Sequence, residues 1–141
     1  MFIEILLYFG ICFALALHSM HIYIQKPYPI SLIVYNSLTN QKNLTFATDI
    51  AYRGILLGAM RKIQATTNDF KFTITEDLNY GPFLESVNGV PGIDADRTYW
   101  ELLVKLQNGI VIRPDVGQYR FSVGCYIPNP HDTVILKFTK W

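Results

Sequence analysis

The stretch that decides the fold is PFLESVNG, residues 82–89. Residues 82–87 form an expected strand, and Asn88-Gly89 ends it with the strongest short signal for a β-hairpin, because both residues tolerate the positive φ angles of a tight turn. Before it, residues 70–75 (FKFTIT) alternate strictly between apolar and polar side chains, which predicts a half-buried strand. The centre of the chain is therefore predicted to consist of strands joined by tight turns.

Further strands are expected on both sides of this centre. Residues 30–35 are rich in β-branched side chains, and the polar stretch 36–43 would turn the chain into a returning strand at residues 44–47. Residues 98–105 are aromatic and apolar, and residues 133–141 alternate again. The sequence thus predicts about five strands, antiparallel or mixed.

One helix is expected between these strands. Apolar residues recur at helical period along one stripe, which we expect to pack on a sheet face containing Phe72, Trp100 and part of Val134, Leu136 and Phe138. Thr48 is the expected N-cap, and Asp49 would suit the positive end of the helix. Gly54 and Gly58, which cost about 1 kcal/mol each relative to Ala, are interpreted as allowing close packing. The stripe consists of Tyr52, Ile55, Leu56, Ala59, Met60 and Ile63.

These elements predict an α+β, β-grasp-like domain, in which one helix packs on a sheet of about five strands with hairpins. The length of 141 residues suits a single domain, and 50% apolar with 16% charged residues excludes a disordered chain. A net charge of +1 gives no basic surplus for nucleic acid. Two cysteines exclude a disulfide framework.

The amino terminus has the pattern of a secretory signal peptide, which we assign to residues 1–19. Its apolar run, Ile5 to Leu17, is 13 residues long, whereas a bilayer span needs about 20. Small-x-small cleavage sites lie at residues 14–16 and 17–19, although Glu4 replaces the usual positive region. The prediction is a secreted, extracellular domain at residues 20–141 with no membrane contact after cleavage. The alternative is an uncleaved membrane anchor.

Two further residues bear on secretion. Cleavage would remove Cys12 and leave Cys125 alone. Such a cysteine is either buried or paired between chains, and burial is favoured. Asn43 begins the tripeptide Asn-Leu-Thr, an N-glycosylation sequon in a polar stretch.

Catalytic and metal-binding patterns are absent from the sequence. The histidines, His18, His21 and His131, accompany no recognisable nucleophile motif, and there is no Cys-x-x-Cys or pair of histidines at ligand spacing. Residues 94–96 (Asp-Ala-Asp) lack the rest of a calcium loop. We therefore expect a non-enzymatic protein that binds no metal directly.

The segments YGPFLESVNG (residues 80–89) and DRTYWELL (residues 96–103) carry a resemblance. They are similar to the carboxy-terminal domain of the vertebrate cobalamin carriers transcobalamin, intrinsic factor and haptocorrin, which has a Tyr/Trp-Gly-Pro-aromatic strand followed by Thr-Tyr-Trp-x-x-Leu. The alternating strand that ends at Trp141 also matches. The resemblance covers residues 28–141.

The resemblance implies a ligand-binding β-grasp that closes over one face of cobalamin, while a separate helical domain, absent from this sequence, holds the rest. It implies ligand contacts from Leu84, Leu102 and the loop from Ile112 to Pro114, and the loop aromatic Tyr80 could add to the wall. The implied ligand is cobalamin, and the implied partners are a separate helical carrier domain or a receptor. The alternative is a secreted protein–protein interaction module that keeps the fold and has lost corrinoid binding.

Overall fold

The computed structural model describes residues 3–6, 25–79, 81–116, 119–120 and 123–141. Most of the predicted signal peptide, residues 1–19, lies outside these ranges, and residues 3–6 form one helical turn. Among the described residues, no helix is both long and apolar enough to cross a bilayer.

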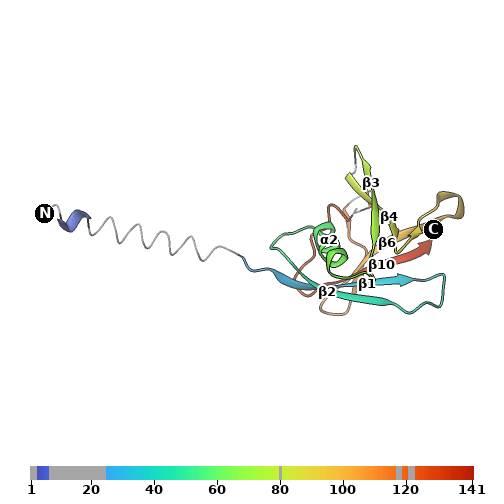
Figure 1. The fold of residues 1–141 in the computed structure, drawn as a ribbon, viewed down its shortest axis with the longest axis horizontal. Helices are drawn as coiled ribbons and strands as arrows, with labels where there is room; N and C mark the ends of the chain where they lie inside the picture. The colour runs from blue at the N-terminus through green and yellow to red at the C-terminus, as the bar shows by residue number, and fades with distance from the viewer. Residues whose placement is uncertain (1–2, 7–24, 80, 117–118, 121–122) are drawn as a thin grey trace.

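A five-stranded sheet forms the base of the domain, in the order β2-β1-β10-β6-β7 (Figure 1). The first and last long strands, β1 and β10, are parallel neighbours in the middle of the sheet, and the other pairs are antiparallel. This arrangement confirms the predicted β-grasp-like α+β fold. The strands are β1 (Tyr28–Asn36), β2 (Leu44–Ile50), β6 (Thr98–Lys105), β7 (Val111–Ile112) and β10 (Thr133–Lys140).

A second, smaller sheet contains the stretch that decides the fold. It consists of β3 (Phe72–Asp77), β4 (Gly81–Val87) and β5 (Val90–Pro91), in that order. Asn88 and Gly89 join β4 to β5 with φ angles of 49° and 78°, so the predicted hairpin turn is confirmed. A 3₁₀ turn (η1, Asp94–Asp96) follows, and β8 (Asp115–Val116) pairs with β9 (Tyr119–Arg120).

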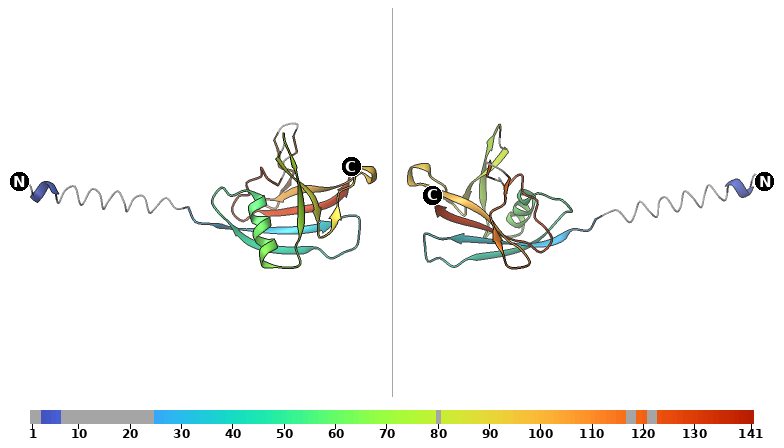
Figure 2. Two further views of the ribbon diagram at one scale, coloured as in Figure 1. Left: turned by 45° about the horizontal axis from the view of Figure 1, so that its top comes forward. Right: turned by 180° about the vertical axis from the view of Figure 1, so that it is seen from behind.

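Helix α2 (Leu56–Thr66) lies on the same face of the large sheet as the β3–β4 hairpin (Figure 2). Its buried residues are Leu56, Leu57, Ala59, Met60 and Ile63, so the helical part of the predicted stripe is confirmed.

The core lies between α2, the small sheet and this face of the large sheet. Val134, Leu136 and Phe138 supply its floor, and Phe72 packs against it partly buried, as predicted. The ring of Trp100 lies 5.1 Å from that of Phe138, and its Nε1 donates a 2.8 Å hydrogen bond to the carbonyl of Val90. Trp100 is therefore a core residue that also ties β6 to the small sheet.

The predicted start of the helix is wrong. Thr48 and Asp49 lie in β2, while Tyr52 and Ile55 precede the helix and are exposed. The N-cap is Ile55, which makes no side-chain capping bond.

Backbone carbonyls from a distant part of the chain cap the helix instead. The amides of Leu56 and Leu57 donate to the carbonyls of Tyr126 and Val123, at 2.8 and 2.9 Å. These bonds satisfy amides that would otherwise lack partners at a helix start. Because the capping carbonyls belong to residues far along the chain, no local sequence pattern could reveal them.

Two smaller predictions are also corrected. Cys125 is exposed, so the favoured burial is wrong. A Cβ on Gly54 would lie 2.8 Å from Cγ1 of Ile50, which confirms close packing there, but one on Gly58 would meet nothing within 4 Å. Gly58 therefore serves no close approach.

Candidate functional site

Leu84 lies on β4, between the small and the large sheet. It is 7% exposed and belongs to the main core, so most of its side chain is structural. It also forms part of the wall of a cavity of about 190 Å³. This cavity is lined by Thr75, Phe83, Leu84, Glu85, Gly92, Asp94, Thr98, Tyr99, Trp100 and Trp141.

Leu102 and Ile112 lie on the same face of the large sheet. Leu102 is paired with Leu136 of β10 and is partly buried against the core. Ile112 of β7 is paired with Val104 of β6, a buried residue two positions after Leu102. Directly paired residues project to one side, and residues two apart on a strand do the same. Both side chains therefore border the core face near the β7 edge.

The structure thus brings Leu84 and Leu102 into one core and leaves Ile112 at the β7 edge of the large sheet. Strands β4 and β6 are in contact, and Leu84 and Leu102 pack in the same core. Ile112 is 38% exposed at the rim, and Pro114 is half-buried beyond β7. Tyr80 lies outside the described residues. The cavity beside Leu84 does not include Leu102 or Ile112 in its lining, so these residues form an open apolar rim.

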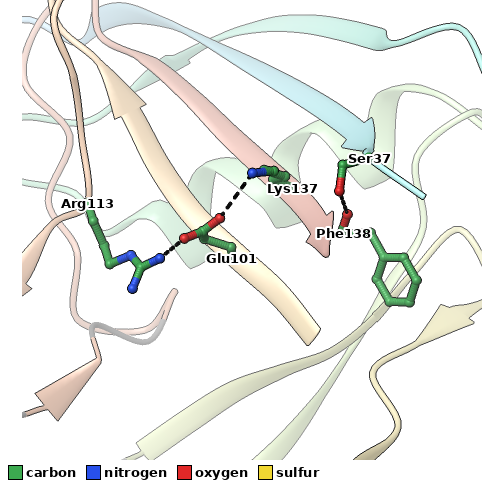
Figure 3. A network of polar contacts seen from close by, with 5 residues as sticks. All are labelled: Ser37, Glu101, Arg113, Lys137 and Phe138. Carbon is green, nitrogen blue, oxygen red and sulfur yellow. Dashed lines mark hydrogen bonds and ion pairs between the residues drawn. The ribbon is translucent and has the colours of Figure 1, made fainter. Parts of the chain in front are cut away.

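A buried carboxylate holds the loop that contains two of these residues. Glu101 is 7% exposed and points to the opposite face of the sheet from Trp100 and Leu102. It forms an ion pair with Arg113, and its Oε2 lies 3.6 Å from Nζ of Lys137 (Figure 3). Arg113 stands between Ile112 and Pro114, so this ion pair ties the predicted contact loop to β6 and β10.

The Glu101 ion pair was not found from the sequence. One signal in the sequence could have indicated it: Glu101 is a charged residue inside the largely apolar strand of residues 98–105, and a buried charge needs a partner. A second polar contact lies nearby, where the Ser37 hydroxyl donates a 2.7 Å hydrogen bond to the carbonyl of Phe138 (Figure 3). It joins the end of β1 to β10.

A second buried polar cluster surrounds Asp132, which is 2% exposed. Its Oδ2 accepts hydrogen bonds from the backbone amide of Asn129 at 2.9 Å and from the Tyr126 hydroxyl at 3.3 Å. Burial, and then the charge of Asp132, raise the pKa of Tyr126 well above its ordinary value. This cluster holds the segment whose carbonyls cap α2, and therefore has a structural role.

A larger cavity, of about 360 Å³, lies between the end of β2 and the start of α2. Its lining includes Pro27, Ile55, Gly58 and Lys62, and none of the predicted contact residues. Within the described part of the chain, no group of three or more His, Cys, Asp or Glu could hold a metal ion. The predicted contact residues therefore lie outside this larger cavity.

No protein-family model and no curated protein matches the chain. Among solved structures, haptocorrin in complex with Cbi (cobinamide, a corrinoid) superposes with a TM-score of 0.66 at 21% identity, over 84% of this chain and 26% of the haptocorrin chain. A protein from Ruminococcus gnavus ATCC 29149, described as a candidate metal-binding protein, matches with a TM-score of 0.54 at 17% identity, over 81% of this chain and 98% of its own. The chain thus spans about a quarter of haptocorrin, and it has the fold of the carboxy-terminal region of that cobalamin carrier, as the resemblance in sequence predicts.

Proposed function

We propose that the chain is a secreted, non-enzymatic domain that binds a cobalamin-type corrinoid on the core face near β4, β6 and β7. The observation that carries this proposal is the match of 84% of the chain to haptocorrin in complex with Cbi. Of the residues that the sequence resemblance assigns to ligand contact, Leu84 and Leu102 pack in the same core, and Ile112 is paired with Val104 at the β7 edge of the large sheet.

The size of the site favours a shared one. Pockets that enclose a drug-sized ligand have volumes of about 300–1,000 Å³, whereas the cavity beside Leu84 measures about 190 Å³. An open apolar rim can cover one side of a broad corrin ring, but it leaves the other side in solvent. We therefore propose weak binding by the chain alone and tight binding once a separate helical domain covers the second face.

Absorbance titration with cobinamide and with cobalamin tests this proposal, with and without a helical carrier domain. We expect a spectral change at high micromolar to millimolar ligand for the chain alone, and at much lower concentration with the helical domain. The absence of both spectral change and retention at millimolar ligand in either case would overturn the proposal.

Two matched variants locate the site. Ile112 and Leu44 are each 38% exposed, but they lie on the opposite edge strands β7 and β2. We expect Ile112→Ala to weaken corrinoid binding and Leu44→Ala to leave it unchanged. Equal effects of the two variants would place the ligand elsewhere.

Secretion and glycosylation are part of the same proposal. Asn43 is exposed just before β2, where an oligosaccharide can be attached without unfolding the sheet. Expression in a secretory cell line should release a chain that begins near residues 17–20 and carries an endoglycosidase-sensitive mass. Asn43→Gln should remove that mass. Retention of an unprocessed chain in the membrane fraction would support the anchor instead.

A second candidate function, a protein–protein interaction module, is favoured by the tip of the β6–β7 hairpin. Ile110, Val111 and Ile112 are three consecutive apolar residues, each at least 38% exposed. Exposed apolar patches mark interaction surfaces. Binding of a protein partner that Ile110→Asp abolishes, in a chain that does not respond to corrinoids, would favour this function.

A further inference from the structure

The cavity of about 190 Å³ beside Leu84 has an unusual chemical lining. The lining includes four aromatic residues, Phe83, Tyr99, Trp100 and Trp141, and two acidic residues, Glu85 and Asp94, and none of the described lining residues is basic. The ring of Trp100 packs in the core, and the Glu85 carboxylate accepts a 2.9 Å hydrogen bond from the Thr73 hydroxyl. The rings of Tyr99 and Trp141 lie 5.5 Å apart at an angle of 52°, so they pack against each other at this cavity.

The walls are held in place by backbone bonds between distant segments. The amide of Trp141 donates to the carbonyl of Arg97 at 3.1 Å, which fixes the residue after β10 beside η1. Figure 1 shows this end of β10 beside the loop that follows β5. The amide of Gly92 donates to the carbonyl of Glu85 at 3.0 Å, and a Cβ on Gly92 would lie 3.1 Å from the carbonyl oxygen of Thr98. The cavity is therefore built into the packing of β4, β6 and the β5–β6 connection.

We propose that this cavity binds an alkylated ammonium group, such as the trimethylammonium of choline. The negative faces of aromatic rings attract organic cations, and quaternary ammonium ions are commonly recognised in this way. Glu85 and Asp94 add negative charge at the same cavity. A neutral apolar ligand would remove the carboxylates from water without compensation, and an anion would be repelled.

The volume of the cavity and the side chains around it exclude two other classes of ligand. A cavity of about 190 Å³ holds a small headgroup but not a corrin ring. A metal ion would need several oxygen, nitrogen or sulfur ligands, and the described residues contain no such group. The trimethylammonium group could come from a soluble molecule or from a lipid headgroup. This inference does not depend on corrinoid binding.

Tryptophan fluorescence gives a local readout, since the chain has only two tryptophans and both line the cavity. We expect tetramethylammonium and choline to change the emission with a Kd of about 1 mM, a weak affinity that suits so few ligand atoms. The neutral carbon isostere 3,3-dimethylbutan-1-ol should bind at least tenfold more weakly. Equal binding of choline and the isostere, or no change of emission up to about 50 mM choline, about fifty times that Kd, would overturn the proposal.

Variants measured by calorimetry complete the test. Trp141→Ala should weaken choline binding about tenfold, which corresponds to the loss of one ring from a cation site. Asp94→Asn should weaken choline binding severalfold at low salt. Asp69 is exposed and lies outside the cavity, so Asp69→Asn makes the same change of net charge and should leave choline binding unchanged. Equal effects of the two Asp variants would contradict a local site. Melting temperatures confirm that each variant folds.

Vesicles of phosphatidylcholine distinguish the two sources of the ligand. Co-sedimentation with these vesicles, reversed by free choline, would support the proposal with a lipid headgroup as the source. Binding of free choline without co-sedimentation would support it with a soluble ligand. Failure of both would overturn it.

Discussion

At the scale of single residues, burial separates structural from accessible side chains along the same short segment. Met60 is completely buried in the core, whereas the next residue, Arg61, is exposed on the polar side of α2. Neighbouring residues also differ on β6, where successive side chains point to opposite faces of the sheet. Trp100 packs in the core, and Glu101 is buried on the other face with its ion-pair partners. One position along the chain therefore changes which contacts a substitution destroys.

Met60→Asp should destabilise the domain far more than Arg61→Asp. A charge in the core must be neutralised or exposed, which costs several kcal/mol out of a total stability of about 5–15 kcal/mol. Arg61→Asp should cost less than about 1 kcal/mol, since it changes an exposed side chain. Urea unfolding of the two purified variants measures the difference, and comparable midpoints would show that the helix face is misassigned.

Tyr126 makes the stability dependent on pH at the alkaline end. Burial first, and then the charge of Asp132, raise its pKa in the folded state above the ordinary value of about 10. A raised pKa favours the folded, protonated form, so its stabilising contribution is complete below pH 10 and is lost as the pH rises towards the folded-state pKa. The free energy of unfolding should therefore fall as the pH increases above about 10.

The variant Tyr126→Phe isolates this effect. It removes the titrating hydroxyl, so the decrease in unfolding free energy above about pH 10 should become shallower. Tyr52→Phe serves as a control, because Tyr52 is exposed and lies outside the Asp132 cluster. If the two variants show the same pH dependence as the unsubstituted chain, Tyr126 does not contribute to it.

At the scale of elements, the sequence predicted those features that depend on residues close together in the chain. The Asn88-Gly89 turn, the alternating strands and the buried side of the helix from Leu56 to Ile63 are confirmed. The start of the helix was wrong, because its capping carbonyls come from Val123 and Tyr126. Apolar periodicity extended the stripe to Tyr52, but tertiary hydrogen bonds set the boundary.

The candidate site was predictable only in part, for the same reason. Leu84 and Leu102 came from motif positions in the resemblance, and the structure shows that both pack in the core. The ion pair of Glu101 with Arg113 and the ring pair of Tyr99 with Trp141 join segments far apart in the sequence. A one-dimensional pattern contains no information on such neighbours until the strand order is known.

Two glycines should respond in opposite directions to the same change. Gly58 lies within α2, and its added Cβ would meet nothing within 4 Å, so Gly58→Ala should stabilise the domain by about 0.5–1 kcal/mol. Gly89 has a φ of 78° in the β4–β5 turn, so Gly89→Ala should destabilise it by about 1 kcal/mol or more. Thermal unfolding of both variants checks the signs, and a stabilising Gly89→Ala would contradict the turn geometry.

At the scale of the whole molecule, the sheet depends on a strand that arrives late in the sequence. β10 lies between β1 and β6, and its backbone pairs with both. The side chains of Val134 and Leu136 are completely buried there. The large sheet is therefore divided into two parts if β10 is missing.

Truncation after residue 132 should abolish folding, because it removes two strand pairings and the floor of the core. A truncation after residue 139 removes only the last residue of β10 and Trp141, and should leave a folded domain with a lower melting temperature. Circular dichroism and urea unfolding distinguish the two chains. A cooperative unfolding transition in the shorter one would show that β1 and β6 can pair without β10.

The central place of β10 also determines when the protein can fold during its synthesis. A ribosome delivers the chain from its amino terminus, so β1 and β2 emerge about 100 residues before the strand that completes their sheet. Until then one backbone edge of β1 has no partner strand, and contacts so distant in sequence form slowly. Native assembly must therefore follow the release of residues 133–140 from the exit tunnel. A chain that remains unfolded for this interval can still be threaded through a translocation pore, which is what the proposed secretion requires.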